Sequence, residues 1–354
     1  MELPVDPKQV GPVCLVTGAN GYVGKHLVRR LLELGCEVRA LDLAPFEGDP
    51  RVRSIVADIR RADEMKLACS GVDTVFHVAA IINTLTLARP SVRRKVYGVN
   101  VEGTENVVRA CQASAVKKLI FTSSITVAVD DPIRGGDETA PYVGNDGLAD
   151  LYSQTKSRAE RFVLEADDPA GLRTAAVRPG GVWGPGEGAM MTRDFLEHLA
   201  AGQFKAMIGN GESVTDNVHV DSVVDVHFLL AKKLGEDPDL VAGEAYFVSD
   251  DEPTNPVLWY RPIVEALGYS WPKVHIPYPI AYAFAYLGEV AHFFGAPMPT
   301  ITRRGVRSIC RDASFRVDKA RAHLGYEPRT SAAEGIPELI GDFRATHDRF
   351  KAGQ

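Results

Sequence analysis

Short runs of β-branched and apolar residues alternate with longer amphipathic segments through the first half of the chain. The short runs are typical of buried strands, and apolar residues spaced three and four apart in the longer segments indicate helices. The predicted strands are 13–17, 38–42, 54–57, 74–78, 118–122 and 174–178, and the predicted helices are 22–34, 62–69, 97–113 and 151–166. Strands and helices in this order predict an α/β fold with a Rossmann-type, doubly wound parallel sheet.

The pattern changes after Pro179, where glycines crowd residues 180–186. Residues 221–233 and 245–248 are typical of a helix and a strand that return to the sheet, and the chain is mostly helical from residue 255 onward. We therefore predict two parts: a Rossmann domain of residues 11–180 plus 216–250, and a smaller, mostly helical C-terminal substrate-binding region of residues 181–215 plus 251–354.

A glycine-rich turn lies between the first predicted strand and the first predicted helix. Its glycines allow a tight turn and let backbone N–H groups approach a pyrophosphate, while the helix N-terminus supplies a favourable dipole. The residues of this predicted cofactor cradle are Gly18, Asn20, Gly21, Tyr22, Val23 and Gly24. Asp42 ends the next strand, where a carboxylate can bind ribose hydroxyls and repel a 2′-phosphate. The sequence therefore predicts a dinucleotide site that favours NAD(H) over NADP(H).

Tyr152 and Lys156 are four residues apart on a predicted helix, so they share one face. A phenol has an ordinary pKa near 10, and a nearby ammonium or an oxidised nicotinamide favours its phenolate. The pair can thus act as a base for alcohol oxidation or an acid for ketone reduction. Ser124 follows the fifth strand and is predicted to hold the reacting oxygen, whereas Ser123 is expected to hydrogen-bond local backbone.

Charge and cysteine content exclude several classes of protein. The 354 residues carry a formal net charge of −6, without the basic footprint of a nucleic-acid-binding protein. The five cysteines have no metal-ligand spacing, so we predict no metal site, and they fit a reducing cytosol. The N-terminal residues lack the apolar core of a signal peptide. We therefore expect a cytoplasmic protein.

Together these motifs resemble the extended short-chain dehydrogenase/reductase superfamily. The matching segments are 17–24, 58–59, 77–80, 100–104, Ser124, 152–156 and 178–179. The resemblance implies that Asp58 and Ile59 lie at the adenine, and that Ala79 and Ala80 lie near the cofactor's ribose and phosphates. It places Asn100 near the active-site helix, and Pro179 and Val182 beside the nicotinamide amide. It also implies a homodimer formed through helices 97–113 and 151–166.

Within this superfamily the chain is most similar to the 3β-hydroxysteroid dehydrogenase family. Segments 123–128 and 178–186 carry that likeness, and segments 247–253, 272–277 and 315–320 resemble its sterol-4α-carboxylate 3-dehydrogenase branch. The resemblance implies NAD-dependent oxidation of a 3β-hydroxyl on a steroid or sterol-like substrate. Tyr152 would be the base, Lys156 would hold the nicotinamide ribose, and Ser124 would position the oxygen. A decarboxylation or an isomerisation can follow this oxidation.

Three alternatives stay open on the same scaffold. One is an NAD(P)H-dependent reductase of 2-alkyl-3-keto acids, which runs the same chemistry backwards. Another is a sugar-nucleotide epimerase or dehydratase, which needs polar and basic residues in the second region to bind a diphosphate. The third is a non-catalytic NAD-sensing protein, disfavoured because Ser124, Tyr152 and Lys156 are all present.

An apolar, aromatic stretch at residues 280–294 predicts a further helix. Ile280, Phe284, Leu287, Ala291 and Phe294 fall on one stripe of it. The helix is too short to span a bilayer. It could be buried in the small domain, form a lid over an apolar, sterol-like ligand, or anchor the protein at the periphery of a membrane.

Overall fold

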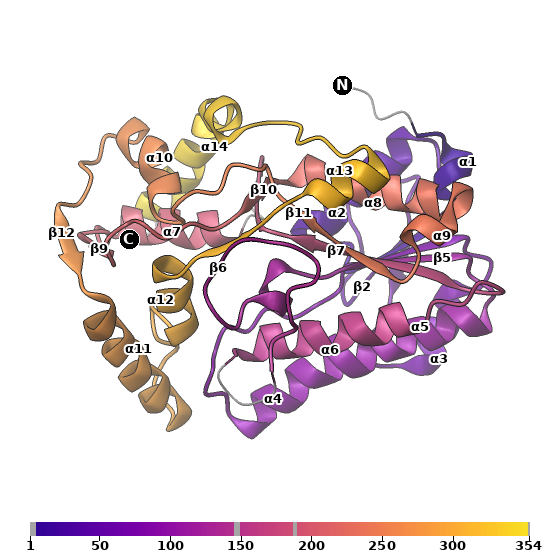
Figure 1. Ribbon diagram of the computed structural model, residues 1–354, viewed down its shortest axis with the longest axis horizontal. Helices are drawn as coiled ribbons and strands as arrows, with labels where there is room; N and C mark the ends of the chain where they lie inside the picture. The colour runs from indigo at the N-terminus through magenta and orange to yellow at the C-terminus, as the bar shows by residue number, and fades with distance from the viewer. Residues whose placement is uncertain (1–4, 145–148, 187–189, 353–354) are drawn as a thin grey trace.

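The computed structural model describes residues 5–144, 149–186 and 190–352. Its centre is a parallel sheet of seven strands in the order β11-β7-β5-β4-β1-β2-β3 (Figure 1). These strands are β1 (Val13–Thr17), β2 (Glu37–Asp42), β3 (Arg53–Val56), β4 (Thr74–His77), β5 (Lys118–Thr122), β7 (Arg173–Pro179) and β11 (Glu244–Val248). The order reverses between β1 and β4, which makes a topological switch point at the carboxyl edge of the sheet. The predicted doubly wound sheet is confirmed.

Helices cover both faces of the sheet, and each face has its own hydrophobic core. One core joins α2 (Tyr22–Glu33) and α8 (Val220–Glu236) to the sheet. The other joins α3 (Ala62–Cys69), α5 (Thr104–Ala113) and α6 (Leu151–Glu165), which lie together below the sheet in Figure 1. Strands buried on both faces explain the continuous apolar runs in the sequence.

The helix predicted for residues 97–113 begins earlier and contains a wider turn. It runs from α4 (Pro90–Tyr97) through a π-helical turn, η1 (Gly98–Gly103), into α5. Such π turns are frequent at functional sites. Here the turn carries Asn100, which is buried.

The described residues also contain short strands outside the central sheet that the sequence did not predict. They form three two-stranded parallel pairs, and the strands are β6 (Ile133–Gly136), β8 (Gly181–Trp183), β9 (Ala206–Ile208), β10 (Asn217–His219), β12 (Val274–Ile276) and β13 (Ala313–Phe315). The pairs are β10 with β8, β12 with β9, and β13 with β6. Strands of three or four residues are too short to show an alternating pattern.

The remaining helices are α1 (Pro7–Val10), η2 (Ile125–Ala128), α7 (Met190–Ala200), α9 (Pro238–Val241), η3 (Leu258–Tyr260), α10 (Arg261–Ala266), α11 (Tyr278–Phe293), α12 (Arg303–Cys310), α13 (Asp318–Leu324) and α14 (Ala332–Ala352). α13 packs on β11 and α8. Part of the predicted substrate-binding region therefore returns to the nucleotide-binding half, while the proposed domain boundaries stay a prediction.

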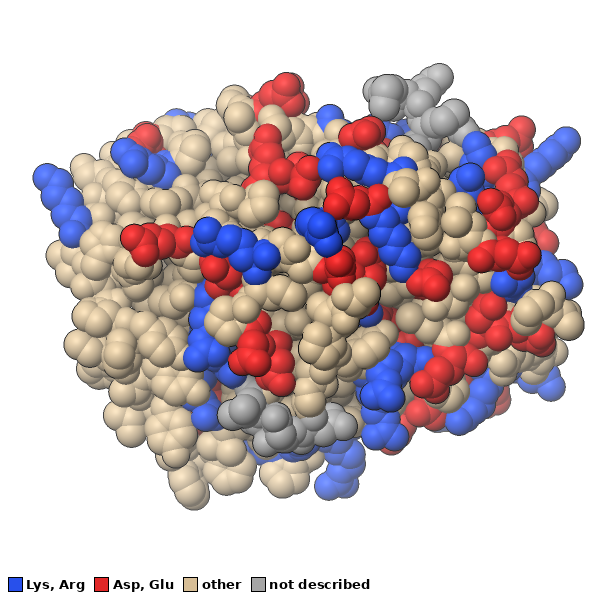
Figure 2. Space-filling view, in the orientation of Figure 1, with Lys and Arg blue, Asp and Glu red and all other residues tan. Residues whose placement is uncertain are grey.

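The apolar stripe of α11 faces outward. Phe284 and Leu287 are 69% and 61% exposed, whereas the buried residues of the helix are Ala281, Ala285 and Glu289. Figure 2 shows that the lower left of the molecule, where α11 lies, has few charged side chains. The alternative of a buried core helix is therefore wrong. No described helix is long and apolar enough to cross a membrane.

Candidate active site

The glycine turn lies at the switch point and packs directly on the segment after β4. Gly18 has a φ of +70°, and a Cβ there would lie 2.7 Å from the Cα of Ala79. A Cβ on Gly24 would lie 2.2 Å from the carbonyl oxygen of Gly18. Only glycine fits these two positions without a backbone shift. The structure thus brings the cradle and Ala79 together, while their contact with a cofactor stays a prediction.

The first turn of α2 suits a bound diphosphate. Its N-cap residue, Gly21, provides no side-chain cap, so the first N–H groups, including those of Tyr22 and Val23, have no side-chain partner. The Tyr22 hydroxyl donates to the carbonyl oxygen of Pro185 at 3.1 Å. That hydrogen bond draws the loop after β8, which follows Val182, against the cradle. These residues fit a dinucleotide.

Two carboxylates follow adjacent strands at the adenosine end of the site. Asp42 accepts hydrogen bonds from the backbone N–H groups of Asn20 and Leu43 at 2.9 and 2.7 Å, and it remains half-buried. Asp58 pairs with Arg60 at 2.5 Å, and this guanidinium lowers the pKa of the carboxyl.

A backbone hydrogen bond also joins the carboxyl ends of β2 and β3. The Ala57 N–H donates to the carbonyl oxygen of Asp42 at 3.0 Å, which holds the end of β3 beside the end of β2. Ile59 is buried, and a Cβ on Gly103 would lie 2.7 Å from its side chain. The structure therefore brings Asp42 and the Asp58–Ile59 segment to one edge of the sheet, and their place at the adenosine stays a prediction.

Asn100 connects the segment after β4 to the catalytic helix. Its side-chain oxygen accepts from the Ile81 N–H at 2.7 Å. Its Nδ2 donates to the Ile81 carbonyl oxygen and to Thr155 Oγ1, both at 3.0 Å. Asn100 therefore fixes the strip containing Ala79 and Ala80 against α6, near the active-site helix as predicted.

His77 lies beneath the cradle as a neutral hydrogen-bonding residue. Its ring bridges Thr17 Oγ1 at 2.7 Å and Thr104 Oγ1 at 2.9 Å. Burial lowers the pKa of His77 to about 3. The ring therefore ties β1, β4 and α5 together without carrying charge at neutral pH.

Tyr152 and Ser124 meet at the carboxyl end of the sheet. A hydrogen bond joins the Ser124 and Tyr152 side chains. Burial raises the pKa of Tyr152 to about 12; the positive charge of Arg304 opposes this shift, Asp150 adds to it, and the Ser124 hydrogen bond lowers the pKa. By contrast, the buried hydroxyl of Ser123 has no partner among the described residues, so its expected backbone bond is wrong.

Lys156 lies one turn further along α6 and is almost completely buried. Its Nζ donates to the carbonyl oxygen of Thr122 at 2.6 Å and lies 4.5 Å from the centre of the Phe121 ring. Burial lowers the pKa of Lys156 to about 7, and Glu160 opposes this shift. The positive charge of Arg304, which lies on α12, therefore favours the phenolate in this structure. The effect of Lys156 on the phenol stays a prediction.

Two functional features were not predicted. Asp150 caps α6 and pairs with Arg304, whose Nε lies 2.8 Å from its Oδ2. Glu160 and Arg178 form a buried ion pair at 2.6 Å that fastens α6 to β7. An aspartate just before a helix is a recognisable N-cap signal, but no sequence pattern connects residues 150 and 304.

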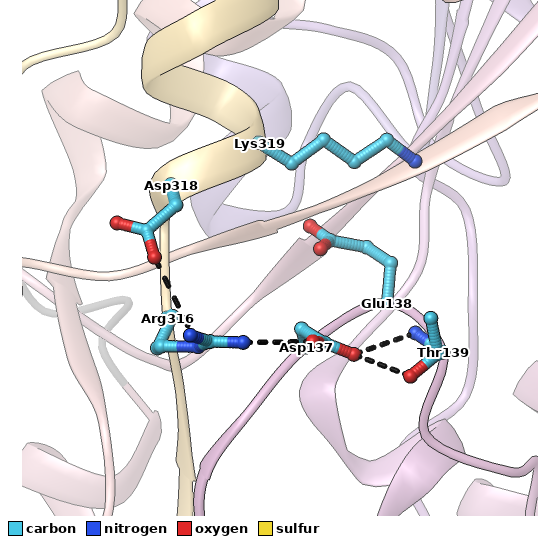
Figure 3. Close-up of a pocket in the computed structure, with 6 residues that line it drawn as sticks. All are labelled: Asp137, Glu138, Thr139, Arg316, Asp318 and Lys319. Carbon is cyan, nitrogen blue, oxygen red and sulfur yellow. Dashed lines mark hydrogen bonds and ion pairs between the residues drawn. The ribbon is translucent and has the colours of Figure 1, made fainter.

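A charged pocket of about 350 Å³ lies elsewhere, beside β6 and α13 (Figure 3). Arg316 binds Asp137 at 2.8 Å and approaches Asp318 at 3.9 Å. Lys319 pairs with Glu244 at 2.6 Å. None of the predicted site residues lines this pocket, and its charges largely neutralise one another, so it is not the dinucleotide site.

The fold and the site together define an extended short-chain dehydrogenase/reductase, an oxidoreductase that acts on CH–OH groups. The chain belongs to the 3-beta hydroxysteroid dehydrogenase/isomerase family, whose family model matches residues 15–278. This membership confirms the resemblance at the level of the family. The likeness to the sterol-4α-carboxylate branch stays a prediction.

Relatives of the chain match it along most of its length. The 3 beta-hydroxysteroid dehydrogenase/Delta 5→4-isomerase of Mycobacterium tuberculosis is 37% identical over 343 residues, covering 95% of this chain and 92% of that protein. The short-chain dehydrogenase/reductase family 42E member 1 of Danio rerio is 38% identical, with 91% and 86% covered. A dTDP-glucose 4,6-dehydratase of Streptomyces venezuelae, solved with NAD bound, shares the fold at 21% identity and a TM-score of 0.72, covering 97% of this chain and all of that one.

Proposed function

We propose that this protein oxidises a 3β-hydroxyl group on a steroid or sterol-like substrate with NAD, using Tyr152 as the base. The observation that supports the proposal is the hydrogen bond between Ser124 and Tyr152 at the carboxyl edge of the sheet, the same edge at which the glycine cradle follows β1. The names of the relatives support the substrate class.

Each side chain has a distinct part in this chemistry. When bound, the cofactor would supply the hydride acceptor. Ser124 donates a hydrogen bond to the substrate oxygen and holds it beside Tyr152, which takes the hydroxyl proton. The Lys156 amine donates a hydrogen bond to the carbonyl oxygen of Thr122 at 2.6 Å, and this bond holds it where it binds the nicotinamide ribose.

The residues at the adenosine end support NAD as the cofactor. The Asp42 carboxylate repels a 2′-phosphate, and a neighbouring arginine would be needed to offset that repulsion. Arg39 cannot take that part, because it is buried and donates to the carbonyl oxygens of Ala68 and Ser70 at 3.2 and 2.6 Å. The site therefore favours an unphosphorylated ribose.

A substrate panel tests the proposal directly. The absorbance of reduced nicotinamide is followed with NAD and 3β-hydroxysteroids, sterol acids, hydroxy fatty acids and nucleotide sugars in turn. We expect turnover with a 3β-hydroxysteroid and a loss of at least about a hundredfold in Tyr152→Phe. Tyr97→Phe is the matched control, because it removes only a 3.5 Å hydrogen bond to Gln154.

The same panel separates the competing functions. Turnover confined to nucleotide sugars would establish the epimerase or dehydratase alternative, and NADH oxidation with only 2-alkyl-3-keto acids would establish the reductase. Full turnover in the Tyr152→Phe variant would show that Tyr152 is not the base, and it would support a function that does not depend on this residue. Product analysis then shows whether isomerisation or decarboxylation follows oxidation.

We also propose that the exposed face of α11 contacts a membrane surface, where it would receive an apolar substrate. Its stripe is apolar, and the one acidic residue of the helix, Glu289, is buried. Replacing Phe284 and Leu287 by serine should abolish flotation with phospholipid vesicles. If vesicle binding is unchanged and only the KM for the steroid increases, α11 is a lid.

Sedimentation velocity tests the homodimer expected through α5 and α6.

A further inference from the structure

Arg304 extends from the C-terminal region to the first turn of the catalytic helix. It is the second residue of α12, and its Nε lies 2.8 Å from Asp150 Oδ2. The Asp150 side chain is almost fully buried, and that of Arg304 is about one quarter exposed. The pair is therefore shielded enough from solvent for its charges to matter locally.

Asp150 organises the start of α6. Its Oδ1 accepts hydrogen bonds from the backbone N–H groups of Tyr152 and Ser153 at 3.0 and 3.2 Å. Its Oδ2 accepts from the Ser153 hydroxyl at 2.7 Å, on the same oxygen that faces Arg304. A buried carboxylate two residues from the catalytic phenol disfavours the phenolate unless a cation compensates it.

The start of α12 is held firmly, which fixes the place of Arg304. The neighbouring Arg303 donates from its backbone N–H to Glu289 at 2.8 Å and from its guanidinium at 2.9 Å. Glu289 is fully buried and also accepts from the Leu87 N–H at 3.2 Å. One carboxylate thus joins α11, α12 and the segment after β4.

That segment in turn contacts the start of α6. The Tyr152 N–H lies 3.1 Å from the carbonyl oxygen of Asn83, and the Leu151 N–H donates to Leu85 at 3.3 Å. Glu289 is thus connected to the start of α6 in two ways. One connection runs through α12 and the Arg304–Asp150 ion pair, and the other runs through residues 83–87. Both end at the backbone N–H of Tyr152.

We propose that Arg304 is a positioning residue of this active site: through Asp150 it fixes the start of α6, and it places a compensating positive charge on the buried carboxylate that caps the helix carrying Tyr152. The inference rests on the proposed function, in which Tyr152 exchanges the proton. The groups that act on the phenol are Arg304 from α12, Asp150 at the N-cap of α6 and Ser124 from the segment after β5. Lys156, on the same helix, is engaged by Thr122.

The test is the pH profile of kcat/KM for oxidation of a 3β-hydroxysteroid, with a 3α-deuterated substrate to confirm that hydride transfer limits the rate. Oxidation needs the phenolate, so the rate rises with pH to a plateau. Arg304→Gln should shift this rise upward by about one pH unit, which is about a tenfold loss at neutral pH with the plateau kept. Asp150→Asn, which keeps a good helix cap, should shift it downward.

The double variant Arg304→Gln/Asp150→Asn should return close to the wild-type profile, and Arg304→Lys should stay within about threefold of wild type. Arg311→Gln, at the opposite end of α12, is the matched control. If Arg304→Gln lowers the plateau of kcat/KM but does not shift the pH at which the rate rises, the proposal is overturned and Arg304 has only a structural role. If Arg304→Gln does not fold, an unshifted profile in Asp150→Asn overturns it equally.

The Tyr152→Phe variant separates this inference from the proposed function. Full turnover in that variant removes Tyr152 as the base and overturns both. Loss of turnover in Tyr152→Phe together with unshifted profiles in the Arg304 and Asp150 variants retains the proposed function and overturns only the part given to Arg304.

Discussion

Replacing Lys156 by methionine should stabilise the folded protein in acid and lose that advantage as the pH rises. Burial lowers the pKa of Lys156 to about 7, whereas an unfolded lysine has a pKa near 10.4. Below about pH 7 the amine is charged in both states, and the full cost of burying that charge opposes folding. Methionine removes this cost and leaves the Thr122 carbonyl oxygen without its 2.6 Å donor.

The sign of the pH dependence follows from proton counting. Between about pH 7 and pH 10 the unfolded chain holds a proton that the folded protein has released, so the wild-type protein gains stability as the pH rises. The gain is about 1.4 kcal/mol per pH unit, or about 3 kcal/mol between pH 7 and pH 9. The methionine variant lacks this contribution.

The measurement is urea unfolding of both proteins at several pH values, with circular dichroism and fluorescence required to agree. The free energy of unfolding of Lys156→Met minus that of wild type should fall by about 3 kcal/mol across this range. The exposed Lys205→Met provides the matched control, with a flat difference. A flat difference for Lys156→Met as well would refute the assignment of a desolvated amine. Its turnover should fall by at least about a hundredfold at every pH.

Three further outcomes are expected. Asp42→Ala should weaken NAD binding and relax discrimination against NADP, measured as the ratio of kcat/KM for the two cofactors; an unchanged ratio contradicts the role of this carboxylate. Gly24→Ala forces a Cβ to within 2.2 Å of the Gly18 oxygen and should cost about 1–3 kcal/mol and lower NAD affinity at least tenfold by fluorescence titration. Glu160→Gln leaves Arg178 buried without its counter-ion and should destabilise the protein by about 3 kcal/mol in urea unfolding, whereas a loss below about 1 kcal/mol would show that the pair is solvated.

The central sheet was predictable because its inner strands are buried on both faces, although the edge strand β3 is largely exposed. β1 and β5 begin and end at the predicted residues, and the other strands of the large sheet differ from prediction by a residue or two at their ends. The glycine spacing predicted a tight turn, whereas the contact between Gly18 and the segment after β4 came only from the structure, where close backbone approach requires a residue without a side chain.

The errors and omissions arise where tertiary contacts override local pattern. Apolar periodicity defined the stripe of α11 correctly, but periodicity does not reveal which side of a helix meets the protein. The buried Glu289, held by Arg303 and the Leu87 N–H, turns that stripe outward. Likewise, Arg304 looks like any other exposed basic residue of the sequence until the fold brings α12 to Asp150.

The energetics of the site also differ from what the Tyr152–Lys156 spacing suggests. Burial acts against ionisation of both groups, since it raises the pKa of the phenol and lowers that of the amine. The Lys156 amine is engaged by the carbonyl oxygen of Thr122. We propose that the charge that offsets Asp150 comes from Arg304, which lies 152 positions beyond Tyr152 in the sequence. α12 belongs to the C-terminal region that is expected to select the substrate, and through Arg304 it would also affect proton transfer at Tyr152. Substitutions in α12 should therefore alter rate and specificity together.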